Sequence, residues 1–156
     1  MSVSIAGRVA LVTGASSGFG EATALELAKA GVKVGLSARR VDRLNDLKAR
    51  IEAAGGEAFV FEADFTQEAQ AIAAVQATER HFGKLDILIN NAGVMYLEPV
   101  ATADLARWRS MFELNLLGLI AATQAALPGM TARKSGHIIN ISSTAGHYAN
   151  ANMSAY

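Results

Sequence analysis

VALVTGASSGFG, residues 9–20, is the stretch that decides the fold. The apolar run at 9–13 predicts a buried strand, and the glycines at 14, 18 and 20 predict a tight turn into a helix. Glycine permits such a turn and lets a ligand approach the backbone closely. The first turn of the helix has N–H groups free for a pyrophosphate. The stretch therefore predicts a dinucleotide site that comprises Gly14, Ser16, Ser17, Gly18, Phe19 and Gly20.

The spacing of these glycines leaves an alternative open. G-x-x-x-G-x-G differs from the G-x-G-x-x-G fingerprint, and no Lys-Ser or Lys-Thr pair follows that would indicate a P-loop. The alternative is a glycine turn with only a structural role. Its position directly after the first strand of a strand–helix–strand unit favours a ligand site.

Strand and helix patterns alternate along the whole chain. Further strands are predicted at 32–37, 58–62, 85–89 and 137–141, and helices at 18–30, around 44–51, at 67–82 and at 108–133. The strands are continuously apolar, which is typical of a parallel sheet covered by helices on both faces. We therefore expect one dinucleotide-binding domain over residues 1–156, with a doubly wound α/β fold and strand order 3-2-1-4-5.

The composition excludes several classes of partner. The net charge is zero, with 14 basic and 14 acidic residues, which argues against nucleic-acid binding and a polybasic membrane patch. Cysteine is absent and the three histidines show no metal-ligand spacing, so we expect no metal site. The N-terminus does not resemble a signal peptide, and the apolar stretch 114–130, interrupted by Asn115, Gln124 and Pro128, is predicted to fall short of a membrane span. We expect a cytoplasmic protein.

The end of the second predicted strand indicates the cofactor. A fold that prefers NAD has an acid there for the ribose 2′-hydroxyl, whereas this chain has Ser37-Ala38-Arg39-Arg40 and no acid before Asp42. A guanidinium suits a 2′-phosphate, so Ser37, Arg39 and Arg40 are predicted to bind NADP(H). The alternative is a solvated helix start. A basic pair at a helix N-terminus opposes the helix dipole, which favours an anionic ligand.

Six motifs occur in a recognisable order. They are TGASSGFG, Asp64 in EADFT, NNAG at 90–93, Asn115 in ELNLLG, Ser143 at the end of IINISS, and Tyr156. Together they resemble the short-chain dehydrogenase/reductase family, in its NADP-preferring group, from about Gly7 to Tyr156. The sequences of these motifs are similar to those of bacterial members that act on small hydroxy compounds.

The resemblance implies an NADP(H)-dependent oxidoreductase that interconverts a carbonyl and a secondary alcohol. It implies that Tyr156 passes the proton, that Ser143 hydrogen-bonds the substrate oxygen, and that Asn115 helps to hold a water in a proton relay. It also implies that Asp64, with Phe65, caps the adenine. A small carbonyl or alcohol would be the substrate.

Other residues have weaker assignments. The resemblance places Asn91, Ala92 and Gly93 along the cofactor, together with Tyr156. Met95, His147 and Tyr148 are interpreted as lining the substrate mouth. Simpler readings remain: Asn91 as a turn residue, Ser143 as a strand-end cap and Asn115 as the cause of a helix bend.

Tyr156 is the last residue, and the lysine that the family has four positions later lies beyond it. We therefore expect an incomplete C-terminus, within a chain of roughly 250 residues. Apolar residues on more than one side of the helix at 111–127 indicate a partner, and the resemblance implies a homodimer or homotetramer. The alternative function is a short, catalytically inactive dinucleotide-binding module.

Overall fold

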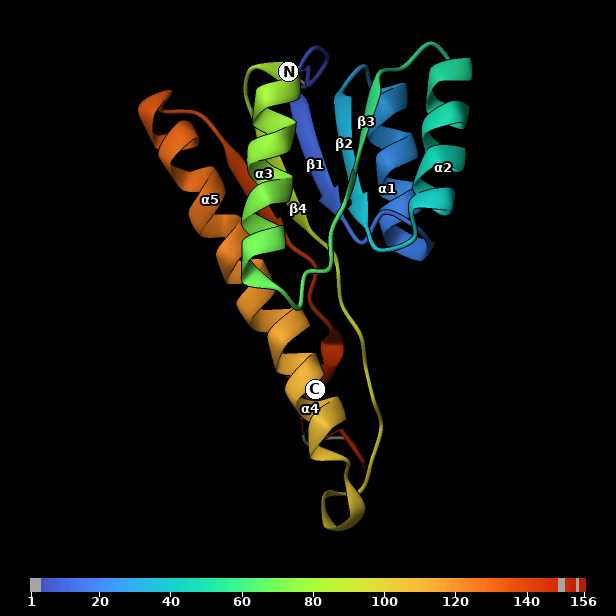
Figure 1. The fold of residues 1–156 in the computed structure, drawn as a ribbon, viewed down its shortest axis with the longest axis vertical. Coiled ribbons are helices and arrows are strands. Elements are labelled where there is room, and N and C mark those ends of the chain that lie inside the picture. The colour runs from blue at the N-terminus through green and yellow to red at the C-terminus, as the bar shows by residue number, and fades with distance from the viewer. Residues whose placement is uncertain (1–3, 149–150, 154) are drawn as a thin grey trace.

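A single parallel sheet organises the chain. The computed structural model describes residues 4–148, 151–153, 155 and 156. Over these residues it has a five-stranded sheet with the order β3-β2-β1-β4-β5, which confirms the predicted order (Figure 1). The strands are β1 Val9–Thr13, β2 Lys33–Ala38, β3 Ala58–Glu62, β4 Ile87–Asn90 and β5 His137–Asn140. All neighbouring pairs are parallel.

Helices cover both faces of the sheet. Helices α1 and α2 lie on one face, and α3 and α5 lie on the other (Figure 1). The helices are α1 Gly18–Lys29, α2 Val41–Ala53, α3 Glu68–Phe82, α4 Leu105–Phe112 and α5 Leu119–Ala132, with 3₁₀ turns at Val100–Thr102 and Thr144–Gly146. A π-helical segment, Glu113–Gly118, joins α4 to α5. The predicted doubly wound α/β fold is confirmed.

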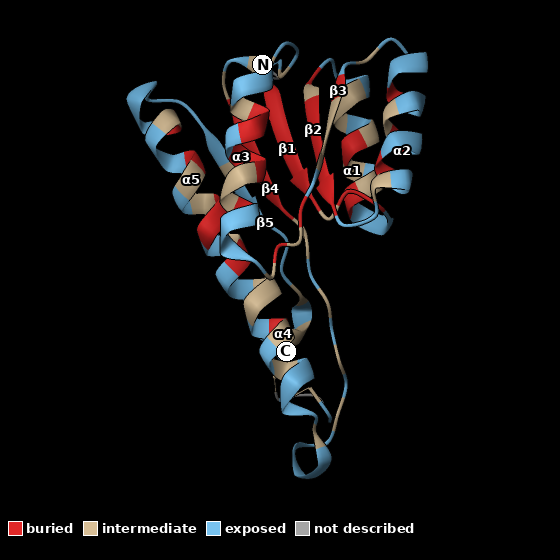
Figure 2. Cartoon of the chain, viewed as in Figure 1, coloured by how far each residue is buried: buried red, intermediate tan, exposed pale blue. Residues whose placement is uncertain are grey.

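Strand β1 divides the interior into two cores. Successive side chains of a strand point to opposite faces. Ala10 and Val12 pack in the core under α1 and α2, whereas Val9 and Leu11 pack in the core under α3 and α5. Figure 2 shows the central strands as buried along their length. This two-sided burial explains why the first strand is continuously apolar in the sequence.

The long helix starts earlier than predicted and is not regular. It begins at Leu105 rather than Trp108, because the Asp104 side chain accepts a hydrogen bond from Ala106 N at 2.9 Å and caps the helix. From Leu105 to Ala132 it spans 28 residues and is long and apolar enough, by length and composition, to cross a membrane. The prediction that this region falls short of a span is therefore wrong on those two measures. Its inner face is buried against the sheet and α3, although only 28% of its most apolar 18-residue window is buried.

Two apolar surfaces remain uncovered in the described part of the chain. Strand β5 lies at the edge of the sheet, where Ile139 and Ile141 are about half exposed. The long helix also exposes large apolar side chains, namely Phe112, Leu116, Leu117, Ile120 and Leu127. The helix surface is the one for which the sequence predicts a partner.

Strand β4 begins at Ile87 rather than Leu85. Just before it, Asp86 bonds to both neighbouring strands through its backbone, since its N–H donates to the Val9 carbonyl oxygen and its carbonyl oxygen accepts from His137 N–H, each at 2.9 Å. Its carboxylate accepts a hydrogen bond from Val9 N at 2.9 Å and pairs with Lys84 at 2.8 Å. Burial raises the pKa of Asp86, but the hydrogen bonds from Lys84 and Val9 and the charges of Lys84 and Arg8 outweigh burial, so the pKa is lowered.

Replacing Asp86 with alanine is expected to lower the free energy of unfolding by about 1–3 kcal/mol, because Val9 N–H stays buried without an acceptor. A lowered folded-state pKa means that the carboxylate stabilises the fold above its unfolded pKa, and that this is lost as pH falls through the folded pKa. In urea unfolding the difference between wild type and Asp86→Ala should therefore stay constant from about pH 7 to about pH 5 and shrink as the pH falls below the ordinary pKa of 3.8. Asp46→Ala, at an exposed position of α2, is the matched control. Equal stability of the two variants would contradict the prediction.

Candidate functional site

The carboxyl ends of the strands meet at one edge of the sheet, where doubly wound folds bind their ligands. Two adjoining hollows open there. The large cleft, of about 590 Å³, extends from the end of β4 to the described C-terminal residues, and the small cleft, of about 240 Å³, lies between the ends of β1, β2 and β3. Both are lined by Asn91, Ala92 and Gly93, so these three predicted residues form the boundary between them.

The glycine turn packs directly against the segment that follows β4. Gly14 has φ +67°, and a Cβ there would lie 2.8 Å from Ala92 Cα. A Cβ on Gly20 would overlap the carbonyl oxygen of Gly14. Thr13 Oγ1 accepts hydrogen bonds from Asn91 N at 3.0 Å and Ala92 N at 2.9 Å. Only glycine allows this approach, and it leaves the N-terminus of α1 at the edge of the small cleft.

Asn91 does more than form a turn. Its side-chain Nδ2 donates to the carbonyl oxygen of Thr13 at 3.0 Å. The preceding Asn90 is buried, and its Nδ2 donates to Thr123 Oγ1 at 3.1 Å and to Asn140 Oδ1 at 2.9 Å. The two amides therefore tie β4 to the glycine turn on one side and to α5 and β5 on the other.

The small cleft has the donors that an anion requires. Arg40 Nη2 donates to Ser17 Oγ at 2.6 Å and to Ser16 Oγ at 3.0 Å, which holds the guanidinium against the glycine turn. Arg39 lines the same cleft and is exposed. The carboxylate of Asp64 also lines it, and its Oδ1 accepts from Thr66 N at 3.0 Å. Two guanidinium groups beside a helix N-terminus fit a phosphorylated dinucleotide.

Some predicted cofactor residues have other positions. Ser37 is fully buried in the sheet, and its hydroxyl donates to the carbonyl oxygen of Phe61 at 2.8 Å, away from both clefts. Phe65 lines the small cleft, but it belongs to the core under α3 and is only 4% exposed. Gly18, with φ +59°, shapes the turn without lining either cleft. Phe19 is 83% exposed and reaches the large cleft instead.

The large cleft brings together the three residues predicted to be catalytic. Asn115 comes from the π-helical segment, Ser143 from the loop after β5, and Tyr156 from the described C-terminal residues. Ser143 Oγ caps the following turn by accepting from Ala145 N at 3.1 Å. A hydroxyl that accepts at a cap still has its own proton to donate. The cap and the substrate hydrogen bond are therefore compatible.

Asn115 also has a structural role. Its Oδ1 accepts from Val94 N at 2.9 Å, and its Nδ2 donates to the carbonyl oxygen of Val94 at 2.8 Å. The π-helical segment that carries it was not predicted from the sequence; such segments occur often at functional sites. A Cβ on Gly118, at the end of the segment, would overlap the Phe65 carbonyl oxygen, so close packing onto the small cleft fixes the irregular turn.

The substrate residues are only partly brought together. Met95 lines the large cleft, whereas His147 and Tyr148 are exposed and do not line it. Sequence reasoning missed most of the apolar lining. The missed residues are Val94, Met111, Phe112, Leu116, Leu119 and Ile141. The available signal was the helix at 111–127, whose apolar residues lie on more than one side. No cluster of metal-ligating side chains occurs among residues 4–148, 151–153, 155 and 156.

Comparisons with known proteins agree with this geometry. The family model for short chain dehydrogenases matches residues 8–156. An uncharacterized oxidoreductase of Listeria innocua is 40% identical over 144 residues, which cover 92% of this chain and 58% of that protein. The NADP-dependent 3-hydroxy acid dehydrogenase of Escherichia coli is 37% identical over 149 residues, which cover 95% of this chain and 59% of that protein. The chain thus spans less than two thirds of either relative.

A solved structure has the same fold at comparable identity. The crystal structure of a metagenomic short-chain oxidoreductase in complex with NADP superposes with a TM-score of 0.93 at 40% identity. The match covers 99% of this chain and 70% of that one.

Proposed function

This chain belongs to the short-chain dehydrogenase/reductase family, and on that premise we propose that it acts in an NADP(H)-dependent oxidoreductase that interconverts a carbonyl compound and a secondary alcohol. One observation carries the proposal. Asn115, Ser143 and Tyr156, from three distant parts of the sequence, line a single cleft. That cleft adjoins a second one lined by Arg39 and Arg40.

Different residues bind the cofactor and transfer the proton. The glycine turn, with Ser16, Ser17 and the two arginines, would hold the phosphates of the dinucleotide. When bound, the dinucleotide supplies or accepts a hydride. In the reducing direction the carbonyl oxygen gains negative charge and needs a proton. The Tyr156 hydroxyl is the proton donor, and in the reverse direction the Tyr156 phenolate accepts the proton from the alcohol.

Ser143 and Asn115 support that proton transfer. The Ser143 hydroxyl donates a hydrogen bond to the substrate oxygen and stabilises the charge that develops there. Asn115 fixes the backbone of Val94 in the cleft wall and, as a proposal from the family, holds a relay water. Met95 contacts the substrate, and Phe19 contacts the cofactor from the wall of the large cleft.

The preference for NADP(H) has three supports. Arg39 and Arg40 line the small cleft without an acid at the end of β2. The E. coli relative is named NADP-dependent, and the metagenomic relative binds NADP. Guanidinium groups bind phosphate in a planar, bidentate manner, which suits a 2′-phosphate.

The cellular setting follows as a set of expectations. We propose a cytoplasmic protein, because a chain without cysteine fits a reducing compartment. We also propose a homodimer or homotetramer, with the exposed apolar side of the long helix as one contact. Nucleic acid and membrane are not proposed as partners. Residues 1–156 are proposed to act as one dinucleotide-binding domain.

The test is a screen of carbonyl compounds with NADPH and NADH, and of alcohols with NADP⁺ and NAD⁺, on the full-length gene product. Nicotinamide absorbance follows turnover, and protein fluorescence follows binding. Carbonyl reduction with a preference for NADPH is expected. NADPH binding without turnover of any compound would favour the inactive dinucleotide-binding module. A preference for NADH would contradict the role given to the arginines.

A further inference from the structure

The segment Val94-Met95-Tyr96-Leu97-Glu98, directly after the NNAG motif, is extended and alternates in exposure. Val94, Tyr96 and Glu98 are partly buried, whereas Met95 is 45% and Leu97 is 54% exposed. Alternate residues of an extended chain point to opposite sides. Met95 and Val94 line the large cleft, whereas Leu97 does not. The alternation places the exposed Leu97 side chain on the same side of the segment as Met95.

The opposite side of the segment is held by contacts at every second residue. The Asn115 amide binds both backbone groups of Val94, and Tyr96 N donates to Met111 Sδ at 3.2 Å. The guanidinium of Arg107 lies 5.3 Å from the centroid of the Tyr96 ring. A cation over an aromatic face is attracted by the ring. These contacts attach the segment to α4 and to the π-helical segment.

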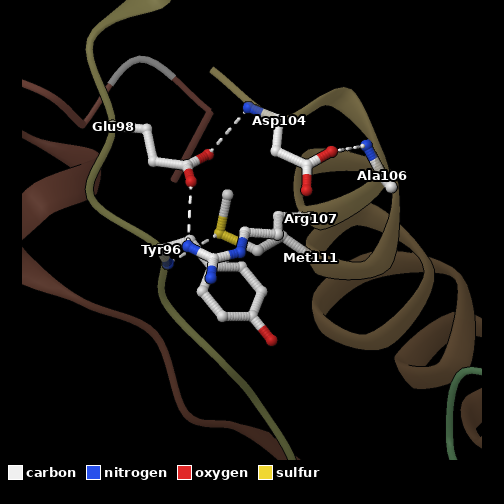
Figure 3. Close-up of polar contacts among 6 residues, drawn as sticks. All are labelled: Tyr96, Glu98, Asp104, Ala106, Arg107 and Met111. Atoms are coloured by element: carbon white, nitrogen blue, oxygen red, sulfur yellow. Dashed lines mark hydrogen bonds and ion pairs between the residues drawn. The ribbon is translucent and has the colours of Figure 1, made fainter. Parts of the chain in front are cut away.

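Glu98 connects this side to two further parts of the chain. Its Oε1 accepts from Arg107 Nη1 at 3.0 Å, and its Oε2 accepts from Asp104 N at 3.2 Å. Its own N–H donates to the carbonyl oxygen of Asn152, four residues before Tyr156, at 3.0 Å. Figure 3 shows the Arg107 guanidinium between the Glu98 carboxylate and the Tyr96 ring. We call Glu98, Arg107 and Asp104 the clamp.

The clamp combines partial burial with several bonds. The side chain of Glu98 is 16% exposed, although that of Arg107 is 57% exposed. An exposed ion pair alone contributes little. Here both oxygens of the Glu98 carboxylate accept charge-assisted hydrogen bonds. One comes from Arg107 of α4, and the other comes from the backbone N–H of the N-cap residue Asp104. The charged groups of Glu98 and Arg107 face each other. No charged side chain occurs among the described residues that line the large cleft.

We propose that Glu98 is a positioning residue for substrate specificity: the clamp fixes Met95 and Leu97 as an apolar wall that receives an apolar substituent of the substrate carbonyl. The inference rests on the proposed function and adds the class of substrate to it. Leu97 is the specificity-determining residue that neither the motifs nor the cleft lining identify.

The test uses full-length protein, NADPH and a series of methyl ketones from acetone to long-chain members. Wild type should have the lowest KM for the long members. Leu97→Ala and Glu98→Ala should each raise that KM about tenfold, with kcat unchanged and the KM for acetone and the Kd for NADPH within about twofold of wild type. Glu98→Gln keeps one acceptor oxygen and should give an intermediate KM. Because Glu98 acts through Leu97, the double variant should be no worse than Leu97→Ala alone.

Glu57→Ala is the matched control, since it removes the partner of Lys33 from another surface ion pair. Its KM should equal that of wild type, and thermal unfolding should show all variants folded at the assay temperature. Equal changes in KM for acetone and for long ketones in Glu98→Ala would contradict the proposed role of the clamp. Additive effects on KM in the double variant would contradict it as well. A wild type that reduces other carbonyl compounds but favours acetone in this series would overturn the apolar wall alone. NADPH binding with no reduction of any carbonyl compound would overturn the proposed function and the clamp with it.

Discussion

Replacing Tyr156 with phenylalanine is expected to lower kcat by about 10²–10⁴-fold in the full-length protein, while NADPH still binds. The substitution removes only the hydroxyl and keeps the ring that lines the large cleft. The carbonyl oxygen then lacks its proton donor at the moment when charge develops on it. This range corresponds to about 2.7–5.4 kcal/mol of transition-state stabilisation. Steady-state kinetics and NADPH fluorescence titration measure the two properties separately.

Tyr148→Phe provides the matched control. Tyr148 is 70% exposed and does not line the large cleft, although it lies close to Ser143 in the sequence. Its loss of the hydroxyl should leave kcat within about twofold of wild type. If Tyr156→Phe keeps wild-type kcat, another group supplies the proton. If both variants lose activity alike, the loop after β5 is being disturbed rather than the chemistry.

The strands could be predicted because their sequence signal arises from burial on both faces. The predicted and observed bounds of β1 and β3 are identical, and those of β2, β4 and β5 differ by one or two residues. Strand β4 differs most at its start, next to Asp86, which bonds to Val9 of β1 by both its backbone and its side chain. The start of the long helix differs because the Asp104 cap was not recognised. Both are local contacts that hydrophobic patterning does not report.

The π-helical segment lies beyond sequence reasoning for a different reason. Its sequence, ELNLLG, includes Asn115, a poor helix former that suggests a bend, but nothing in it specifies a π-helical turn. The irregular turn depends on close packing of Gly118 against the backbone of Phe65, a residue that is distant in sequence. Only the folded chain brings these two together.

Some residues of the functional site could likewise be predicted from the sequence, and others could not. Residues that act through a motif, such as Asn115 and Ser143, could be named from the sequence because the resemblance carries them. Ser37 could not be excluded, because its hydroxyl is used inside the sheet by the carbonyl of Phe61. The clamp at Glu98 could not be predicted either, since its contacts with Arg107 and Asp104 arise where the loop after β4 folds back onto the start of α4, which hydrophobic periodicity does not report.

Removing both guanidinium groups of the small cleft, in the double variant Arg39→Ala with Arg40→Ala, is expected to raise the Kd for NADPH about a hundredfold. The Kd for NADH should change by less than about threefold, because only the 2′-phosphate loses its partners. Arg40 is already oriented by Ser16 and Ser17, so little side-chain freedom is lost on binding and its share of the effect should be the larger. Fluorescence titration of both dinucleotides gives the two constants.

Arg43→Ala is the matched control for the loss of charge. Arg43 is exposed on α2, one turn beyond Arg39, and does not line the small cleft. It should leave both constants within about twofold of wild type, because its exposed side chain makes no direct contact in the small cleft. Because the lost contacts are charge-assisted, the difference between wild type and the double variant should narrow as salt rises. Equal weakening of NADPH and NADH in the double variant would mean that the arginines bind the shared pyrophosphate, and the preference for NADP(H) would then need another source. An unchanged Kd for NADPH would mean that Arg39 and Arg40 are only the solvated start of a helix. The proposal that the small cleft binds the 2′-phosphate would then be contradicted.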